Sequence, residues 1–197
     1  IYLSYIQENL GKTASGGLVV ETSPIINPTN LELDTSNSVG IADDELDTAI
    51  ENLLTGKEPV AVSLAEEPAK IGMEFKEPIK MDSISIAVPN ANNAPSSGFI
   101  DVVDVNNVTH KIEYGEKAYR NPVGFSAKIN RSTGSIKIDL GKQVAVKKIT
   151  IIVNETTNKD ANLAEIGKVE FLNNVYEEIP VPKMNIPTIT GVETGAE

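Results

Sequence analysis

The chain has 197 residues, a formal net charge of −11 at pH 7, one histidine, no cysteine and no tryptophan. Without cysteine it can form no disulfide, thiolate zinc site, cysteine nucleophile or iron–sulfur centre. The acidic balance argues against a nucleic-acid partner, because a negative surface repels phosphate. No stretch approaches the roughly 18–20 apolar residues of a membrane span, so we also predict no membrane insertion.

Residues 1–17 are predicted to be an N-terminal remnant or linker. Apolar residues in Ile1–Leu10 fit either the end of a helix stopped by Gly11 or a remnant of an upstream domain. Residues Thr13–Gly17 (TASGG) have the composition of a flexible linker. The chain does not begin with methionine, and we interpret it as a piece of a larger protein, with residues 1–17 as an N-terminal remnant or linker.

One short helix is predicted after a β-and-turn region over residues 18–40. In Asp43–Leu54 the apolar residues recur at helical spacing, and three successive acidic residues favour the helix N-terminus. Gly56 is placed to end this helix.

From Val60 to Leu172 the apolar period is two. Apolar residues alternate with polar or small ones in Ile84–Val88, Ile136–Leu140 and Ile149–Val153, as expected of half-buried strands. Clusters of Asn, Pro, Ser and Gly separate these runs. Many short strands with regular turn signals predict a β-sandwich or barrel.

Two segments of this region repeat a pattern. Ile71–Val88 and Ile136–Val153 align without a gap, and both read as strand, turn and strand. They could be two tandem repeats, or one sandwich that uses a similar strand–turn–strand twice. We favour the single sandwich, because the spacing leaves too little chain for two.

The C-terminal tail predicts a linker. Three prolines in Val175–Pro187 favour an extended chain. Residues Ile186–Glu197 resemble the opening strand of a fibronectin type III domain. We therefore predict a sandwich over residues 18–174 and a proline-rich linker over 175–197 that leads toward a next module.

Four segments together resemble discoidin-like domains, which are also called coagulation-factor type C domains and include bacterial galactose-binding-like carbohydrate modules. Lys70–Val88 is similar to a strand pair of that family, Phe99–Ile112 to its central strands, and Leu163–Leu172, with Ala-Glu-Ile, to its closing strand. Ile50–Val62 stands where the family has an Asp-Gly-Asp loop. The resemblance implies an all-β jelly-roll sandwich, here with one short helix.

The resemblance also implies a function. Members are non-catalytic modules of secreted or cell-surface bacterial proteins, and they bind a glycan or cell-surface polysaccharide beside neighbouring modules of the same chain. We expect the same here, at an extracellular location and without enzymatic activity, since the adjacent carboxylates of the sequence are not placed to face each other across a sugar. The alternative is a structural spacer or protein-interaction module with the same fold and no sugar site.

The family's structural calcium loop is degenerate in this chain. Its aspartate positions correspond to Thr55 and Lys57, and Glu165 corresponds to the glutamate of the closing strand. An ammonium group cannot bind calcium, which takes six to eight oxygen ligands, so we favour no cofactor and no metal. Either Lys57 replaces the ion and neutralises Glu165, or it points to solvent.

Candidate ligand-binding residues follow from the chemistry of sugar recognition, which combines an aromatic face with amides and charged groups. The loop 154–162, where relatives carry an aromatic residue, has none, but it offers Asn158 and Asp160. Tyr119, Arg120 and Asn121 adjoin in a predicted loop and could serve instead, although a tyrosine at a strand end also suits a core. Relatives use a histidine for galactose, but the alternation in 108–112 favours a partly buried, structural His110.

Overall fold

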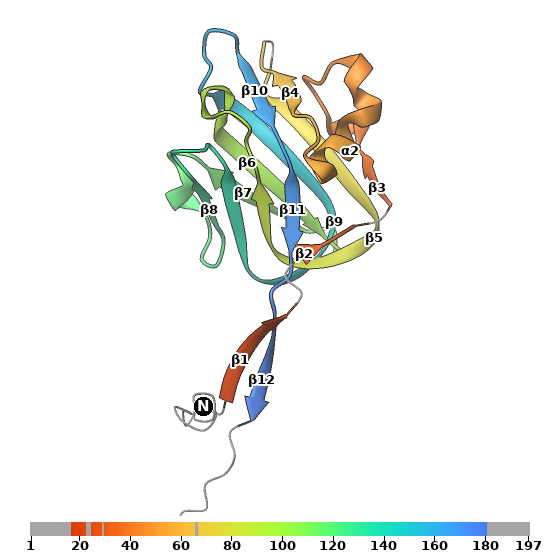
Figure 1. Ribbon diagram of the computed structural model, residues 1–197, viewed down its shortest axis with the longest axis vertical. Helices are drawn as coiled ribbons and strands as arrows, with labels where there is room; N and C mark the ends of the chain where they lie inside the picture. Colours follow the sequence, from red (N-terminus) through yellow and green to blue (C-terminus); the bar gives the residue numbers. More distant parts are fainter. Residues whose placement is uncertain (1–16, 23–24, 29, 66, 181–197) are drawn as a thin grey trace, which may run out of the picture. The chain divides into compact units, whose positions relative to one another are not determined.

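The computed structural model describes residues 17–22, 25–28, 30–65 and 67–180 (Figure 1). The strands are β1 (Gly17–Thr22), β2 (Ile25–Ile26), β3 (Leu31–Leu33), β4 (Val60–Ser63), β5 (Ala69–Ile86), β6 (Pro95–Asp104), β7 (Thr109–Tyr114), β8 (Ser126–Ile129), β9 (Ile136–Thr156), β10 (Leu163–Ile166), β11 (Val169–Leu172) and β12 (Val175–Pro180). The helices are α2 (Leu46–Thr55) and the 3-10 turns η1 (Thr35–Asn37), η2 (Asp43–Glu45), η3 (Ala91–Asn93) and η4 (Ala118–Arg120). None of the helices in these ranges has both the length and the apolar character needed to cross a bilayer.

The chain divides into two compact units. The larger spans Ser23–Asn174, and in the other β1 pairs with β12 in an antiparallel register from Gly17↔Pro180 to Thr22↔Val175. From the sequence we place residues 18–22 in the sandwich and 175–180 in a linker, whereas the structure pairs these two segments with each other. About 150 residues separate the partners, so no local pattern could indicate the pairing. The expected N-terminal remnant over residues 1–16 and the fibronectin-like segment 186–197 lie outside the described residues.

The larger unit is a two-layered β-sandwich whose layers share two long strands. Strand β5 pairs with β9 along most of its length, but the register shifts between Glu74 and Ile79 and again between Met81 and Ser83. One layer contains β3, the first half of β5, the second half of β9, β6 and β7. The other contains β2, β11, the second half of β5, the first half of β9 and β8. This arrangement confirms the all-β expectation, and α2 is the one α-helix among the residues that the structure describes.

The repeated pattern in the sequence corresponds to these two bent strands. Each of the two similar segments is one continuous strand that bends, where the sequence predicts two strands and a turn. The segments lie against each other in antiparallel register, with Ile71 opposite Ile151 and Ile86 opposite Ile136. Because both lie in the same unit, the single-sandwich interpretation is confirmed over tandem repeats.

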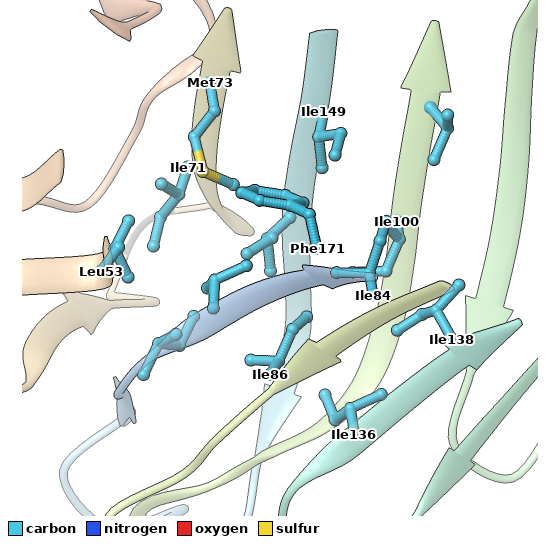
Figure 2. Packing of buried hydrophobic residues seen from close by; sticks show 14 of the residues in the cluster. Leu53, Ile71, Met73, Ile84, Ile86, Ile100, Ile136, Ile138, Ile149 and Phe171 are labelled. Carbon is cyan, nitrogen blue, oxygen red and sulfur yellow. The ribbon is translucent and has the colours of Figure 1, made fainter. Parts of the chain in front are cut away.

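The core lies between the two layers. The inward residues of both layers form one cluster, and Figure 2 shows Phe171 of β11 packed among residues of β5 and β9. The rings of Phe75 and Phe171, from opposite layers, meet edge to face with their centroids 5.3 Å apart. Burial of these side chains, worth roughly 1.5–3 kcal/mol each, explains the two-residue period of the sequence.

Helix α2 covers one side of this core, as the sequence predicts. Its buried residues are Ala49 and Leu53, which lie one turn apart on the same face. Gly56 ends the helix in the left-handed conformation at φ 71°, and its N–H donates to the carbonyl oxygen of Asn52. A residue with a Cβ is strained in this conformation, whereas glycine adopts it without strain. This explains why the glycine at position 56 ends the helix, as the sequence predicts.

A close approach of strands β6 and β9 depends on a second glycine. A Cβ on Gly98 would lie 2.0 Å from the carbonyl oxygen of Ile152 and 2.7 Å from the hydroxyl of Tyr114. That hydroxyl donates a 2.8 Å hydrogen bond to the same carbonyl. Tyr114 is fully buried, and burial raises the pKa of its phenol, so the neutral donor form persists.

Candidate functional site

Hydrogen bonds link the loops at one end of the sandwich, and we call this region the loop end. It consists of residues 90–94 before β6, residues 157–162 after β9, Ser63 at the end of β4, and Ala65 and Glu67 after that strand. The β5–β9 and β6–β9 registers bring these loops together, because Ala69 lies opposite Val153 and Pro95 lies opposite Thr156.

Thr157 fastens two of these loops to each other. Its hydroxyl donates to the carbonyl oxygen of Ala91 at 2.8 Å and accepts from the amide of Ala94 at 2.9 Å. The backbone amide of Thr157 in turn donates to the carbonyl oxygen of Ala94 at 2.8 Å. The two loops are therefore held in a fixed geometry before any ligand binds.

A row of side-chain hydrogen bonds runs across the same surface. The Nδ2 atom of Asn158 donates to Oδ1 of Asn93 at 2.7 Å, and the Nδ2 atom of Asn93 donates to Oε1 of Glu165 at 3.4 Å. The Oδ1 atom of Asn158 accepts from the amide of Ala161 at 3.0 Å. The predicted residue Asn158 is thus part of the loop end, but its amide is largely occupied. Asn93 is missing from the sequence prediction, although its run of polar residues between two strands (NANN) was a signal.

A shallow hollow of about 210 Å³ lies at the end of β4. It is lined by Val39, Gly40, Ser63, Ala65 and Glu67. The backbone connects it directly to the 157–162 loop, because Ser63 pairs with Leu163 and the amide of Leu64 donates to the carbonyl oxygen of Asn162 at 2.9 Å. The exposed carboxylate of Glu67 and the hydroxyl of Ser63 are the polar side chains of the hollow, and no aromatic side chain is among its lining residues.

The other predicted binding residues follow β7. Tyr119 is 80% exposed in η4, which excludes a core position for this tyrosine. Arg120 is also exposed. Asn121 is not available to a ligand, because its Oδ1 accepts from the amide of Glu113 at 2.7 Å and its Nδ2 donates to the carbonyl oxygen of Glu113 at 2.8 Å. No hydrogen bond in the described ranges joins this group to Asn158 or to the exposed Asp160.

The residues at the aspartate positions of the degenerate loop have contacts of their own. The hydroxyl of Thr55 donates to the carbonyl oxygen of Glu51 at 2.8 Å and accepts from the amide of Lys57 at 3.1 Å. The Thr55 hydroxyl is therefore occupied by hydrogen bonds at the C-terminal end of the helix. Lys57 is exposed, and no ion pair joins it to Glu165 among the residues that the structure describes. Of the two interpretations of Lys57, the structure therefore agrees with the solvent-facing one. Within the same ranges, no three His, Asp or Glu side chains cluster as metal ligands would.

His110 lies away from the loop end. Its side chain is 22% exposed, and its Nε2 atom lies 3.0 Å from Oδ2 of Asp104. The ring also stacks at a tilt on Phe125, with centroids 5.4 Å apart. The expectation of a partly buried histidine is confirmed.

No protein-family model and no curated protein sequence matches this chain. Its structure, however, is similar to solved domains. One is CBM32-1 of a family 31 glycoside hydrolase from Clostridium perfringens, with a TM-score of 0.53 and 10% identity over 74% of this chain and 96% of that one. Another is the C-terminal domain of a chitobiase from Bacteroides fragilis, with a TM-score of 0.53 and 11% identity over 78% of this chain and 99% of that one.

A third similar structure contains the CBM32-1, CBM32-2 and M60 catalytic domains of Clostridium perfringens ZmpB. Its TM-score is 0.50 at 9% identity, over 83% of this chain and 17% of that one. At these identities the comparisons establish the fold and not the ligand. The chain has the discoidin-like β-sandwich fold that its sequence motifs suggest.

Proposed function

We propose that the sandwich is a non-catalytic accessory module of a secreted or cell-surface bacterial protein, and that it binds a glycan at the loop end. The main support is the fold, which the chain shares with CBM32 modules, that is, carbohydrate-binding modules, of bacterial glycoside hydrolases. The partners in this proposal are a glycan or cell-surface polysaccharide and neighbouring modules of the same chain.

The chemistry of the loop end is compatible with sugar hydroxyls. The hollow of about 210 Å³ is smaller than the roughly 300–1,000 Å³ of pockets for drug-sized ligands, so it suits part of one sugar unit. Glu67 offers a carboxylate that accepts charge-assisted hydrogen bonds from hydroxyl groups. The fixed loops of 90–94 and 157–162 mean that little conformational entropy is lost on binding.

A second candidate function, a structural spacer or protein-interaction module, is supported by a specific observation. The amides of Asn93 and Asn158 are hydrogen-bonded to each other and to their neighbours, and the hollow has no aromatic wall. A polar surface that satisfies its own donors and acceptors gains less from a sugar.

A glycan array probed with the 197-residue chain distinguishes the two candidates. The glycan function predicts a defined set of bound glycans, and titration of the tightest should show about tenfold weaker affinity for Glu67→Gln, since a hydrogen bond to a charged group contributes roughly 1.5–3 kcal/mol. Glu77→Gln is the matched control, because Glu77 is also an exposed carboxylate and lies in the bend of β5 at the opposite end. An array without any bound glycan would favour the spacer, and equal affinity in the two variants would contradict binding at the loop end.

A further inference from the structure

The pair of strands β1 and β12, which we call the ribbon, has a topology that makes it respond to tension. Its six residue pairs run in antiparallel register from Gly17↔Pro180 to Thr22↔Val175 (Figure 1). The chain enters the ribbon at Gly17 and leaves it at Pro180, and these two residues lie opposite each other at one end. A pull on the two flanks of the chain therefore loads this pair first and opens the pairs one at a time.

The ribbon also determines when the sandwich bears that pull. The larger unit, Ser23–Asn174, is the stretch of chain between the two ribbon strands. As long as Thr22 is paired with Val175, tension passes from one ribbon strand to the other and does not reach the ends of the sandwich. The topology therefore fixes the order of the two events, because the ribbon must open before the sandwich is loaded.

Side-chain hydrogen bonds anchor the last residues of the sandwich. The amide and the Nδ2 atom of Asn174 donate to Oδ2 and Oδ1 of Asp82 at 3.1 and 3.2 Å. The Nε2 atom of Gln143 donates to Oδ1 of Asn173 at 3.1 Å. Asp82 lies in β5 and Gln143 in β9, so the residues just before β12 are joined to both long strands. Hydrogen bonds to a carboxylate are roughly twice as strong as those between neutral groups, which makes Asp82 the stronger anchor.

These anchors reinforce a short strand pairing. β2 pairs with β11 only at Ile25↔Leu172 and Ile26↔Phe171, and a pull on the flanks would open this pairing from the Ile25 end. Phe171 is fully buried, and its ring meets that of Phe75 in the core. The anchored asparagines come before this core residue on the path of the load, so they resist the pull before any core contact breaks.

We propose that the ribbon is a reversible extension element, which opens under tension while the sandwich, anchored at Asp82, stays folded. A two-stranded antiparallel sheet is marginally stable in water, so the ribbon opens at low force. When the tension falls it closes again, because the β2–β11 pairing of the folded sandwich holds the two flanks together. Only residues 23–24 and 173–174 separate that pairing from the ribbon, so little entropy is lost on closure.

An extension element suits a module that is held at both ends. In the cell-surface setting, which rests on the proposed function, the chain would lengthen while the loop end keeps its geometry. The element itself does not require a ligand at the loop end.

Optical tweezers applied to the 197-residue chain test the proposal. Azide-bearing residues at positions 16 and 181 attach the handles directly beside the ribbon. Opening of its twelve residues should give a reversible gain of about 4 nm in contour length. Unfolding of the 152 residues of the larger unit should follow at higher force as a gain of roughly 50 nm. One combined gain, or a first gain that does not reverse, would overturn the proposal.

A disulfide across the ribbon tests the path of the load. The chain has no cysteine, so the double variant Val19→Cys with Glu178→Cys can form only this bridge. Val19 lies opposite Glu178, and such positions are roughly 4.5–5.5 Å apart at Cα, within the range of a disulfide. After oxidation the 50 nm gain should disappear, because the bridge carries the load past the sandwich, and reduction should restore it. Failure of the bridge to form, or a 50 nm gain in the bridged chain, would overturn the proposal.

Asp82→Ala tests the anchor. The first gain should occur at an unchanged force, whereas the sandwich should unfold about tenfold faster at a given force, as expected for a lost hydrogen bond to a charged acceptor. Asp139→Ala is the matched control, because the carboxylate of Asp139 accepts from the amide of Gly141 within one turn, and its effect should be smaller. Equal effects of the two variants, or an altered first gain in Asp82→Ala, would overturn the role of the anchor. None of these measurements uses a glycan, so their results are independent of binding at the loop end.

Discussion

Replacement of Gly98 by alanine is the sharpest test of how the sandwich packs. The added Cβ would lie 2.0 Å from the carbonyl oxygen of Ile152 and 2.7 Å from the Tyr114 hydroxyl, both in the interior of the unit. Backbone must move, which costs about 1–3 kcal/mol as overpacking. The buried hydrogen bond from Tyr114 to Ile152 is lost or lengthened, at a further cost of about 1–3 kcal/mol.

The expected sum is about 2–6 kcal/mol, or a fall in melting temperature of roughly 5–20 °C for a domain of this size. Urea denaturation with circular dichroism measures it. Gly124→Ala is the control, since Gly124 has φ 98° but no atom within 4 Å of the added Cβ, and it should cost only the roughly 1–2 kcal/mol of a left-handed residue. In a double-mutant cycle with Tyr114→Phe, the combined cost should be smaller than the sum of the single costs, because both variants remove the same bond. A Gly98→Ala chain as stable as Gly124→Ala would refute this account of the β6–β9 contact.

Three further variants test other contacts. Asn121→Ala should destabilise the unit by about 1–3 kcal/mol in urea unfolding, because it removes two hydrogen bonds to the backbone of Glu113. A change below about 0.5 kcal/mol would show that these two hydrogen bonds do not stabilise the unit. Leu53→Ala should cost about 2–5 kcal/mol, since Leu53 is fully buried, whereas the neighbouring Asn52→Ala should cost far less by the same assay. The pKa of Asp104 is lowered in the fold by its bonds from His110 and the Val108 amide, so its stabilising contribution is complete above about pH 4 and is lost as the pH falls through the folded-state value. The stability difference between the parent chain and Asp104→Asn should therefore shrink below about pH 4 in a pH series of urea unfolding curves, and a constant difference would be inconsistent with the ionised carboxylate.

Much of the fold could be predicted because its signals are local. The helix over 43–54 follows from apolar spacing and ends at Gly56, and the alternation in 84–88 and 149–153 follows from strands that bury one face. The pairing of strands that are distant in the sequence is not indicated by any local pattern of residues. Neither the β1–β12 pair nor the continuity of β5 and β9 through their bends can be deduced from residues that are adjacent in the sequence.

The candidate site was less predictable, since it depends on which polar groups are already occupied. Asn121 and Asn158 are suitable residue types, but their partners at Glu113 and Asn93 come from other segments and are visible only in the fold. The pairing of His110 with Asp104 joins residues six positions apart, and the hollow that His110 lines together with the bend of β9 again requires the tertiary structure.

The most direct test of the glycan-binding proposal is an amide shift map. The full chain, labelled with ¹⁵N, is titrated with the tightest glycan from the array, and the shifted amides are assigned. The proposal predicts shifts that saturate in residues 90–94 and 157–162 and around Ser63 and Glu67. Shifts confined to the outer faces of the sheets, or no saturable shift with any glycan, would contradict it.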